Sequence, residues 1–114
     1  MRGKLNWQQG FIWYRPSEYT DGDEVLRAPL REGWLRARVY RLPASECRVK
    51  DGLSPAEGLR LVLEPGWDLR AGDVLRPIGD MSATYELTDL RVYPAHVEAL
   101  LQRRLTDVAG EVWT

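Results

Sequence analysis

The sequence predicts a mainly β fold, a small antiparallel β-barrel or sandwich with a long polar loop and a short C-terminal helix. Three observations support this prediction. Runs of alternating apolar and polar residues recur along the chain, and clusters of Gly, Pro and Asp separate them at intervals of about 8–12 residues. The length of 114 residues is typical of a single domain covering residues 1–114. A hydrophobic content of 44% is sufficient for one core.

The N-terminal part is expected to hold an arm, a first strand and a turn. Residues 1–10 are polar and contain two glycines, which predicts a flexible N-terminal arm. The barrel is expected over residues 11–93. It begins with Phe-Ile-Trp-Tyr at residues 11–14, because aromatic and β-branched side chains favour a half-buried strand. Asp-Gly-Asp at residues 21–23 predicts a hairpin turn, since glycine accepts a positive φ.

Two later segments alternate most regularly. In residues 33–42, apolar residues occupy every second position and the opposite face carries Arg36, Arg38 and Tyr40. Residues 59–63 alternate in the same way, with leucine at every second position. Both segments are therefore predicted to be strands. Two arginines beside a tyrosine also suit an OB-fold surface for single-stranded nucleic acid, although acidic residues in the adjoining segments favour a solvated face or a protein interface.

A long polar loop is expected over residues 43–58. It carries Arg48, Lys50 and Asp51 and shows no alternating apolar face that would pack on the barrel. Loops of this length in compact domains are usually functional. We therefore expect this loop to be mobile in the free protein and to become ordered in an assembly.

The remaining segments predict short strands and a helix. Residues 74–77 are predicted to form a short strand that ends at a proline. Residues 83–93 change their apolar parity near Thr88 and Asp89, which predicts a bulge or bend there. In residues 94–108, apolar side chains recur at helical spacing, which predicts a C-terminal helix. A final strand is the alternative for this segment. Residues 109–114 are expected to be a tail.

The charge balance and the rare residue types exclude several functions. With 16 basic and 17 acidic residues, the net charge of -1 argues against a dedicated nucleic-acid binder. One Cys and one His cannot form a zinc site, so no metal or other cofactor is expected, and Cys47 is expected to be inert. His96 and Glu98 lack a nucleophile or an oxyanion donor, so no enzymatic activity is expected. No apolar run approaches the roughly 18–20 residues that span a bilayer, so no membrane partner is expected.

The five tryptophans point to an interaction surface. A barrel this small cannot fully bury all of them, and exposed Trp and Arg are enriched at the energetic centres of protein interfaces. The long loop and the single His supply further polar candidates. The predicted interface residues are Trp7, Trp13, Arg36, Arg38, Tyr40, Arg48, Lys50, Asp51, Trp67, His96 and Trp113.

The order of several short motifs resembles a known family. An apolar strand at residues 59–63 is followed by Gly-Asp-Val at 72–74, by Tyr-Glu-Leu at 85–87 and by Val-Tyr-Pro-Ala-His at 92–96. This order is similar to that of the small head–tail connector proteins of tailed bacteriophages, the head-completion or stopper group. The strand at residues 11–16 and the Asp-Gly-Asp hairpin after it also fit the N-terminal half of that group. Leu87 stands where the family usually has Val, and a C-terminal helix would depart from its all-β ending.

The resemblance implies a structural protein of the virion, assembled in the host cytoplasm, with no enzymatic role. It implies a ring of identical subunits that closes the channel below the portal, retains packaged DNA and helps to attach the tail. The implied partners are further copies of the chain, the portal or adaptor and tail proteins, and non-specifically the DNA in the channel. The alternative is a small OB- or SH3-like phage or bacterial domain that binds single-stranded nucleic acid or a host protein.

Overall fold

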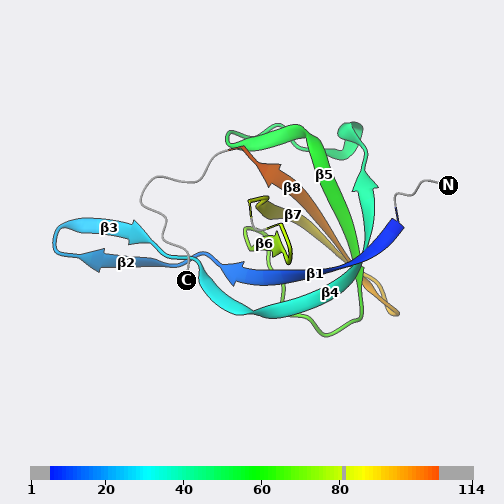
Figure 1. The fold of residues 1–114 in the computed structure, drawn as a ribbon, viewed down its shortest axis with the longest axis horizontal. Helices are drawn as coiled ribbons and strands as arrows, with labels where there is room; N and C mark the ends of the chain where they lie inside the picture. Colours follow the sequence, from blue (N-terminus) through cyan, green and yellow to red (C-terminus); the bar gives the residue numbers. More distant parts are fainter. Residues whose placement is uncertain (1–5, 81, 106–114) are drawn as a thin grey trace.

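The computed structural model describes residues 6–80 and 82–105, and it is built almost entirely from strands (Figure 1). A single turn of 3-10 helix, η1 (Ala44–Glu46), follows the fourth strand. The strands of the described part are β1 (Asn6–Arg15), β2 (Glu18–Asp21), β3 (Glu24–Arg27), β4 (Leu30–Leu42), β5 (Leu53–Leu63), β6 (Val74–Pro77), β7 (Tyr85–Val92) and β8 (Val97–Arg104). The predicted mainly β fold is confirmed.

Six of these strands close into a ring in the order β1-β4-β5-β8-β7-β6, in which every neighbouring pair is antiparallel. The predicted alternation places Leu35 and Val39 of β4 inside the ring, and both are almost fully buried. Phe11, Leu61 and Leu101 pack against them from β1, β5 and β8. Burial of each such side chain stabilises the fold by about 1.5–3 kcal/mol.

The strands β2 and β3 form a separate hairpin that projects from one end of the ring (Figure 1). The predicted turn is confirmed, because Gly22 has a φ of 66° between the two strands. At the base of the hairpin, the backbone N–H of Ala28 donates a hydrogen bond to the Ser17 carbonyl at 2.9 Å. The described molecule is therefore elongated, with extents of 53 × 29 × 25 Å.

The predicted C-terminal helix over residues 94–108 is wrong, because this segment contains strand β8. Val97, Leu100 and Leu101, which suggested a helical stripe, are all buried in β8. β8 pairs with β5 on one side and with β7 on the other, so it closes the ring. These two ladders outweigh the helix propensity of the segment. Residues 106–108 and the predicted tail lie outside the described residues.

The expected N-terminal arm and long loop are also more ordered than predicted. Residues 6–10 belong to β1 and pair with β4, so the arm prediction is wrong for them, while residues 1–5 lie outside the described part. Strand β5 already begins at Leu53. The side chain of Gln102, which is fully buried, fixes the loop to β8: it accepts a hydrogen bond from the Arg48 N–H at 2.7 Å and donates to the Arg48 and Ser54 carbonyls at 2.9 Å.

The bulge expected near Thr88 is confirmed. The pairing of β7 with β8 shifts between Leu87 and Asp89, so the two sides of Thr88 have different registers. The Thr88 hydroxyl donates a hydrogen bond to the Leu100 carbonyl at 3.2 Å. This irregularity explains why the apolar residues of β7 change parity along the strand.

Candidate interaction site

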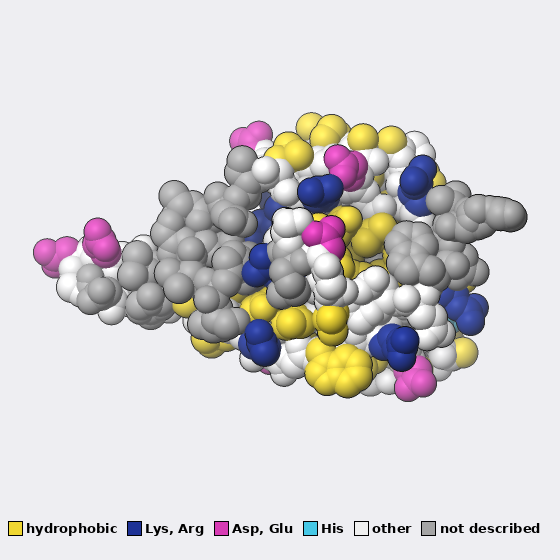
Figure 2. Space-filling view, viewed as in Figure 1, with side chains coloured by type: hydrophobic (Ala, Val, Ile, Leu, Met, Phe, Trp, Pro, Cys, Tyr) yellow, Lys and Arg dark blue, Asp and Glu magenta, His cyan; other side chains and the backbone are white. Residues whose placement is uncertain are grey.

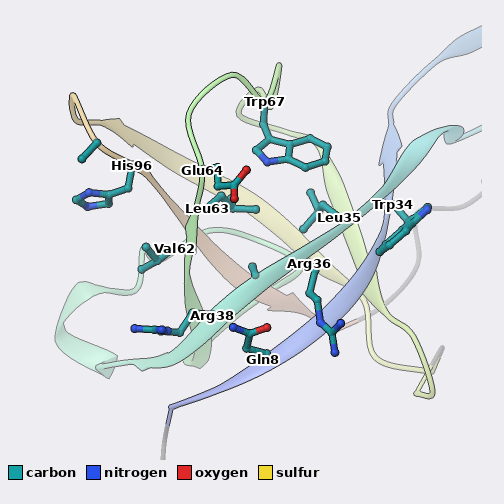
Figure 3. A pocket seen from close by; sticks show the side chains of 12 residues that line it. Gln8, Trp34, Leu35, Arg36, Arg38, Val62, Leu63, Glu64, Trp67 and His96 are labelled. Atoms are coloured by element: carbon teal, nitrogen blue, oxygen red, sulfur yellow. The ribbon is translucent and has the colours of Figure 1, made fainter.

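An open cleft lies where β4 and β5 separate. β4 pairs with β1 along its length but with β5 only from Arg38 to Leu42, so within the described residues the first half of β4 has no strand on that side. The chain leaves β5 after Leu63 and turns away at Gly66, which has a φ of 102°. The resulting cleft, between β4, this connection and the β7–β8 turn, has a volume of about 600 Å³. Its walls include Trp34, Arg36, Arg38, Glu64, Trp67 and His96 (Figure 3).

A buried polar network fixes the connection that carries Trp67. The carboxylate of Asp73, only 1% exposed, accepts hydrogen bonds from the Trp13 indole N–H at 2.9 Å and from the Arg70 backbone N–H at 2.9 Å. Arg15 donates to the same carboxylate from Nε at 3.2 Å and from Nη2 at 3.1 Å. This hydrogen bond is the main reason that the pKa of Arg15 lies above its ordinary value. The indole of Trp67 then packs edge-on against that of Trp13, with ring centroids 6.3 Å apart.

This network corrects one predicted interface residue. Trp13 is 7% exposed and belongs to the core, so it is not available to a partner. Trp67 is partly exposed at 37% and borders the cleft as an interface residue would. The two indoles therefore have different roles, since one anchors the connection internally and the other presents an aromatic surface.

The outer face of β4 and β5 carries a row of arginines, Arg36, Arg38 and Arg60, which we call the arginine stripe. Arg36 and Arg38 are exposed, and within the described residues none of the three makes an ion pair. The guanidinium of Arg60 lies over the ring of Tyr40, 4.9 Å from its centroid. The Nε of Arg60 is buried and has no hydrogen-bond partner among the described atoms. The stripe therefore concentrates positive charge that no carboxylate of the described residues pairs with.

An apolar patch borders the cleft on the outer face of β1 and β4. Trp34 is 65% exposed, and Ile78 is 49% exposed. Ile12 lies directly across the ladder from Trp34. Together with Arg31 and Gly33 these residues line a shallow depression of about 380 Å³. Figure 2 shows yellow hydrophobic side chains gathered on the lower part of the visible face, between dark blue Lys and Arg side chains. Apolar patches rimmed by charged residues are typical of protein interaction sites.

His96 lies at the end of the cleft, in the β7–β8 turn. Its ring stacks on Tyr93 at 4.7 Å between centroids, and its Nε2 lies 3.3 Å from a carboxylate oxygen of Glu98. The Tyr93 N–H donates to the His96 carbonyl at 2.9 Å and closes the turn. These contacts hold the imidazole in place at the rim of the cleft.

The structure separates the predicted interface residues into two groups. Arg36, Arg38, Trp67 and His96 surround the cleft, with Tyr40 half-buried beneath Arg60. The predicted interface residues of the loop lie at a smaller depression of about 260 Å³. Arg48 and Lys50 line this depression, and Asp51 follows Lys50 in the chain. There the Lys50 ammonium pairs with Glu86 at 2.7 Å. The side chain of Trp7 and the whole of Trp113 lie outside what the structure describes.

Sequence reasoning missed Trp34 and Arg60 as surface residues. Trp34 lies on the same strand parity as Arg36 and Arg38, so the alternation of β4 already indicated its outward orientation. Arg60 becomes part of the stripe only through the register of the ladder, in which it lies opposite Tyr40. Register between distant strands has no local sequence signal, so Arg60 was not accessible to sequence reasoning.

Cys47 is a free cysteine of intermediate burial. Burial, and secondarily the neighbouring Glu46, raises the pKa of the Cys47 thiol, which disfavours the nucleophilic thiolate. No group of three or more His, Cys, Asp or Glu side chains in the described segments is arranged to hold a metal ion. Within the same segments, no helix is long and apolar enough to cross a membrane. In the comparisons with known proteins, no family model, curated protein or solved structure matches the chain.

Proposed function

We propose that this protein is a structural subunit of a bacteriophage neck, a head–tail connector or stopper that forms a ring below the portal. In this proposal the closed ring of strands is a small β-barrel, and copies of it surround the channel, retain packaged DNA and help to attach the tail. The observation that carries the proposal is the hairpin β2–β3, which projects from a body whose cleft and apolar patch remain uncovered.

The arrangement of these features suits a ring. A ring of identical subunits needs a heterologous contact, in which one surface meets a different surface of the next copy. The hairpin lies at one end of the long axis, and the β7–β8 turn that borders the cleft lies toward the other end (Figure 1). A projecting element and a distant concave surface on one chain supply the two halves of such a contact.

The composition of the cleft supports binding to protein. Trp and Arg, the residue types that dominate the energetic centres of interfaces, supply four of its twelve lining residues, and Trp34 is largely exposed at its rim. The imidazole of His96 contacts the Glu98 carboxylate and the Tyr93 ring, and within the described residues no Ser, Thr or Cys side chain is hydrogen-bonded to it. The cleft therefore offers contact area and charge.

The proposal is tested by assembly. The protein is examined by sedimentation velocity and negative-stain electron microscopy, alone at rising concentration and after mixing with purified portal rings of the same phage. We expect rings with a central channel, formed by the chain itself or templated on the portal. A chain that remains monomeric at high concentration and does not bind the portal would refute the proposal.

Binding of single-stranded nucleic acid is the second candidate function, because the arginine stripe has no internal ion pairs. The stripe supplies charge for a phosphate backbone, but Arg60 already covers Tyr40 at 4.9 Å, so this ring is not free to stack on a base. Fluorescence anisotropy with a labelled oligo-dT at low and high salt tests this candidate. Affinity that falls steeply with salt supports it, and absence of binding at low salt rejects it.

A further inference from the structure

The tip of the hairpin is strongly acidic. Residues 21–24, Asp-Gly-Asp-Glu, contain three acidic residues and no basic residue. The side chains of Asp23 and Glu24 are exposed and make no ion pair with the described residues. Figure 2 shows magenta carboxylates at this extreme end of the molecule. Asp23 and Glu24 therefore carry negative charge with which no basic side chain of the described part pairs.

The arginine stripe carries the opposite charge at a distance from the hairpin. Figure 3 shows Arg36 and Arg38 along β4 at one side of the cleft, with Glu64 on the facing wall, while the hairpin strands leave the view on the side away from His96. The hairpin points away from the body, so its tip does not lie against its own cleft (Figure 1). Opposite charges on the two separate surfaces are complementary between neighbouring copies.

The edge of β4 adds a second element of fit. Its first half has β1 on one side and, within the described residues, no strand on the other, so it presents backbone donors and acceptors beside the cleft. An incoming strand can add to such an edge by main-chain hydrogen bonds, while side chains fill the neighbouring pocket. Within the described part, β2 and β3 pair only with each other. The outer side of each hairpin strand can therefore form main-chain hydrogen bonds with the edge of β4.

We infer that the acidic tip of the β2–β3 hairpin in one copy docks on the arginine stripe and the open edge of β4 in the next copy. The inference rests on the proposed ring and deepens it, because it names the two surfaces that join neighbouring subunits. The contact is heterologous, and its repetition by a constant rotation closes a ring. Exposed charge pairs are screened by salt, so the association weakens as ionic strength rises.

Charge reversal tests the contact. We expect the double variants Asp23→Arg/Glu24→Arg and Arg36→Glu/Arg38→Glu each to weaken self-association at least tenfold in sedimentation experiments, with the portal ring as template if the free chain does not assemble. A mixture of the two variants restores the association, because each supplies the surface that the other lacks. The matched control is Glu57→Arg, an exposed acidic residue outside both surfaces and outside the predicted interface residues, which is expected to assemble as the unaltered chain does.

Crosslinking tests the geometry directly. In a Cys47→Ser background, a mixture of Asp23→Cys and Arg38→Cys chains treated with a short bismaleimide is expected to give one covalent dimer that neither variant gives alone. If rings form but neither charge reversal alters them and no mixed dimer appears, the contact is refuted while the proposed function stands. If Arg36→Glu/Arg38→Glu abolishes oligo-dT binding and leaves assembly unchanged, the stripe serves nucleic acid and the inference is overturned. If the unaltered chain never assembles, with or without portal, both are refuted.

Discussion

Removal of the Asp73 carboxylate is expected to destabilise the protein severely. The substitution Asp73→Ala leaves the Trp13 indole N–H and the Arg70 backbone N–H without their acceptor. A buried donor left unpaired costs about 1–3 kcal/mol. The guanidinium of Arg15 also loses its contact with Asp73, although it keeps Asp68 at 3.6 Å and Glu32 at 3.8 Å and its side chain is 21% exposed to water. The expected loss of unfolding free energy is about 3–5 kcal/mol, the range measured when one partner of a buried ion pair is removed.

The assay is urea denaturation followed by circular dichroism, because the variant changes the surroundings of Trp13 and would alter tryptophan fluorescence independently of folding. Since small domains are stable by only about 5–15 kcal/mol, a loss of this size moves the midpoint far toward low urea. The control is Asp68→Ala: this neighbouring carboxylate is 68% exposed, so its removal is expected to leave the midpoint close to that of the unaltered chain. Similar midpoints for the two variants would refute the assignment of Asp73 as the buried anchor.

Three further outcomes are expected. Gly58→Ala is expected to cost about 1–3 kcal/mol, because a Cβ there would lie 2.7 Å from the Leu101 carbonyl oxygen, whereas Gly33→Ala has open space around it and is expected to be neutral in the same denaturation assay. Gln102→Ala is expected to accelerate amide hydrogen exchange in residues 48–54, and unchanged protection there would contradict its role in fixing the loop. The raised pKa of Cys47 leaves less thiolate at pH 8, so its alkylation by iodoacetamide is expected to be slower in the folded protein than in urea, and equal rates would contradict this.

Local patterns predicted the elements whose structure depends on local interactions. Alternation in residues 33–42 identified β4 and its outward arginines, the Asp-Gly-Asp sequence identified the hairpin turn, and the change of parity near Thr88 identified the bulge. Each of these features depends on residues that are close in sequence. The mainly β class followed from their repetition along the chain.

Features that depend on distant pairing were not predictable in this way. Val97, Leu100 and Leu101 fit a helical stripe and a buried strand equally well, and only the ladders with β5 and β7 select the strand. The loop appeared free because its anchor, Gln102, lies 54 residues from Arg48 in the chain. Trp13 was assigned to the surface because its partner Asp73 is 60 residues away.

Folding and partner binding use different parts of this chain. A closed sheet satisfies its backbone groups internally, so the surfaces left for a partner are those that the closure omits, namely the hairpin and the open half of β4. The Asp73 network lies beneath the cleft and fixes one wall of it, whereas Asp23 and Glu24 are exposed and touch no part of the core. Charge reversal at the hairpin tip should therefore alter association without altering the free energy of unfolding, while Asp73→Ala should alter both.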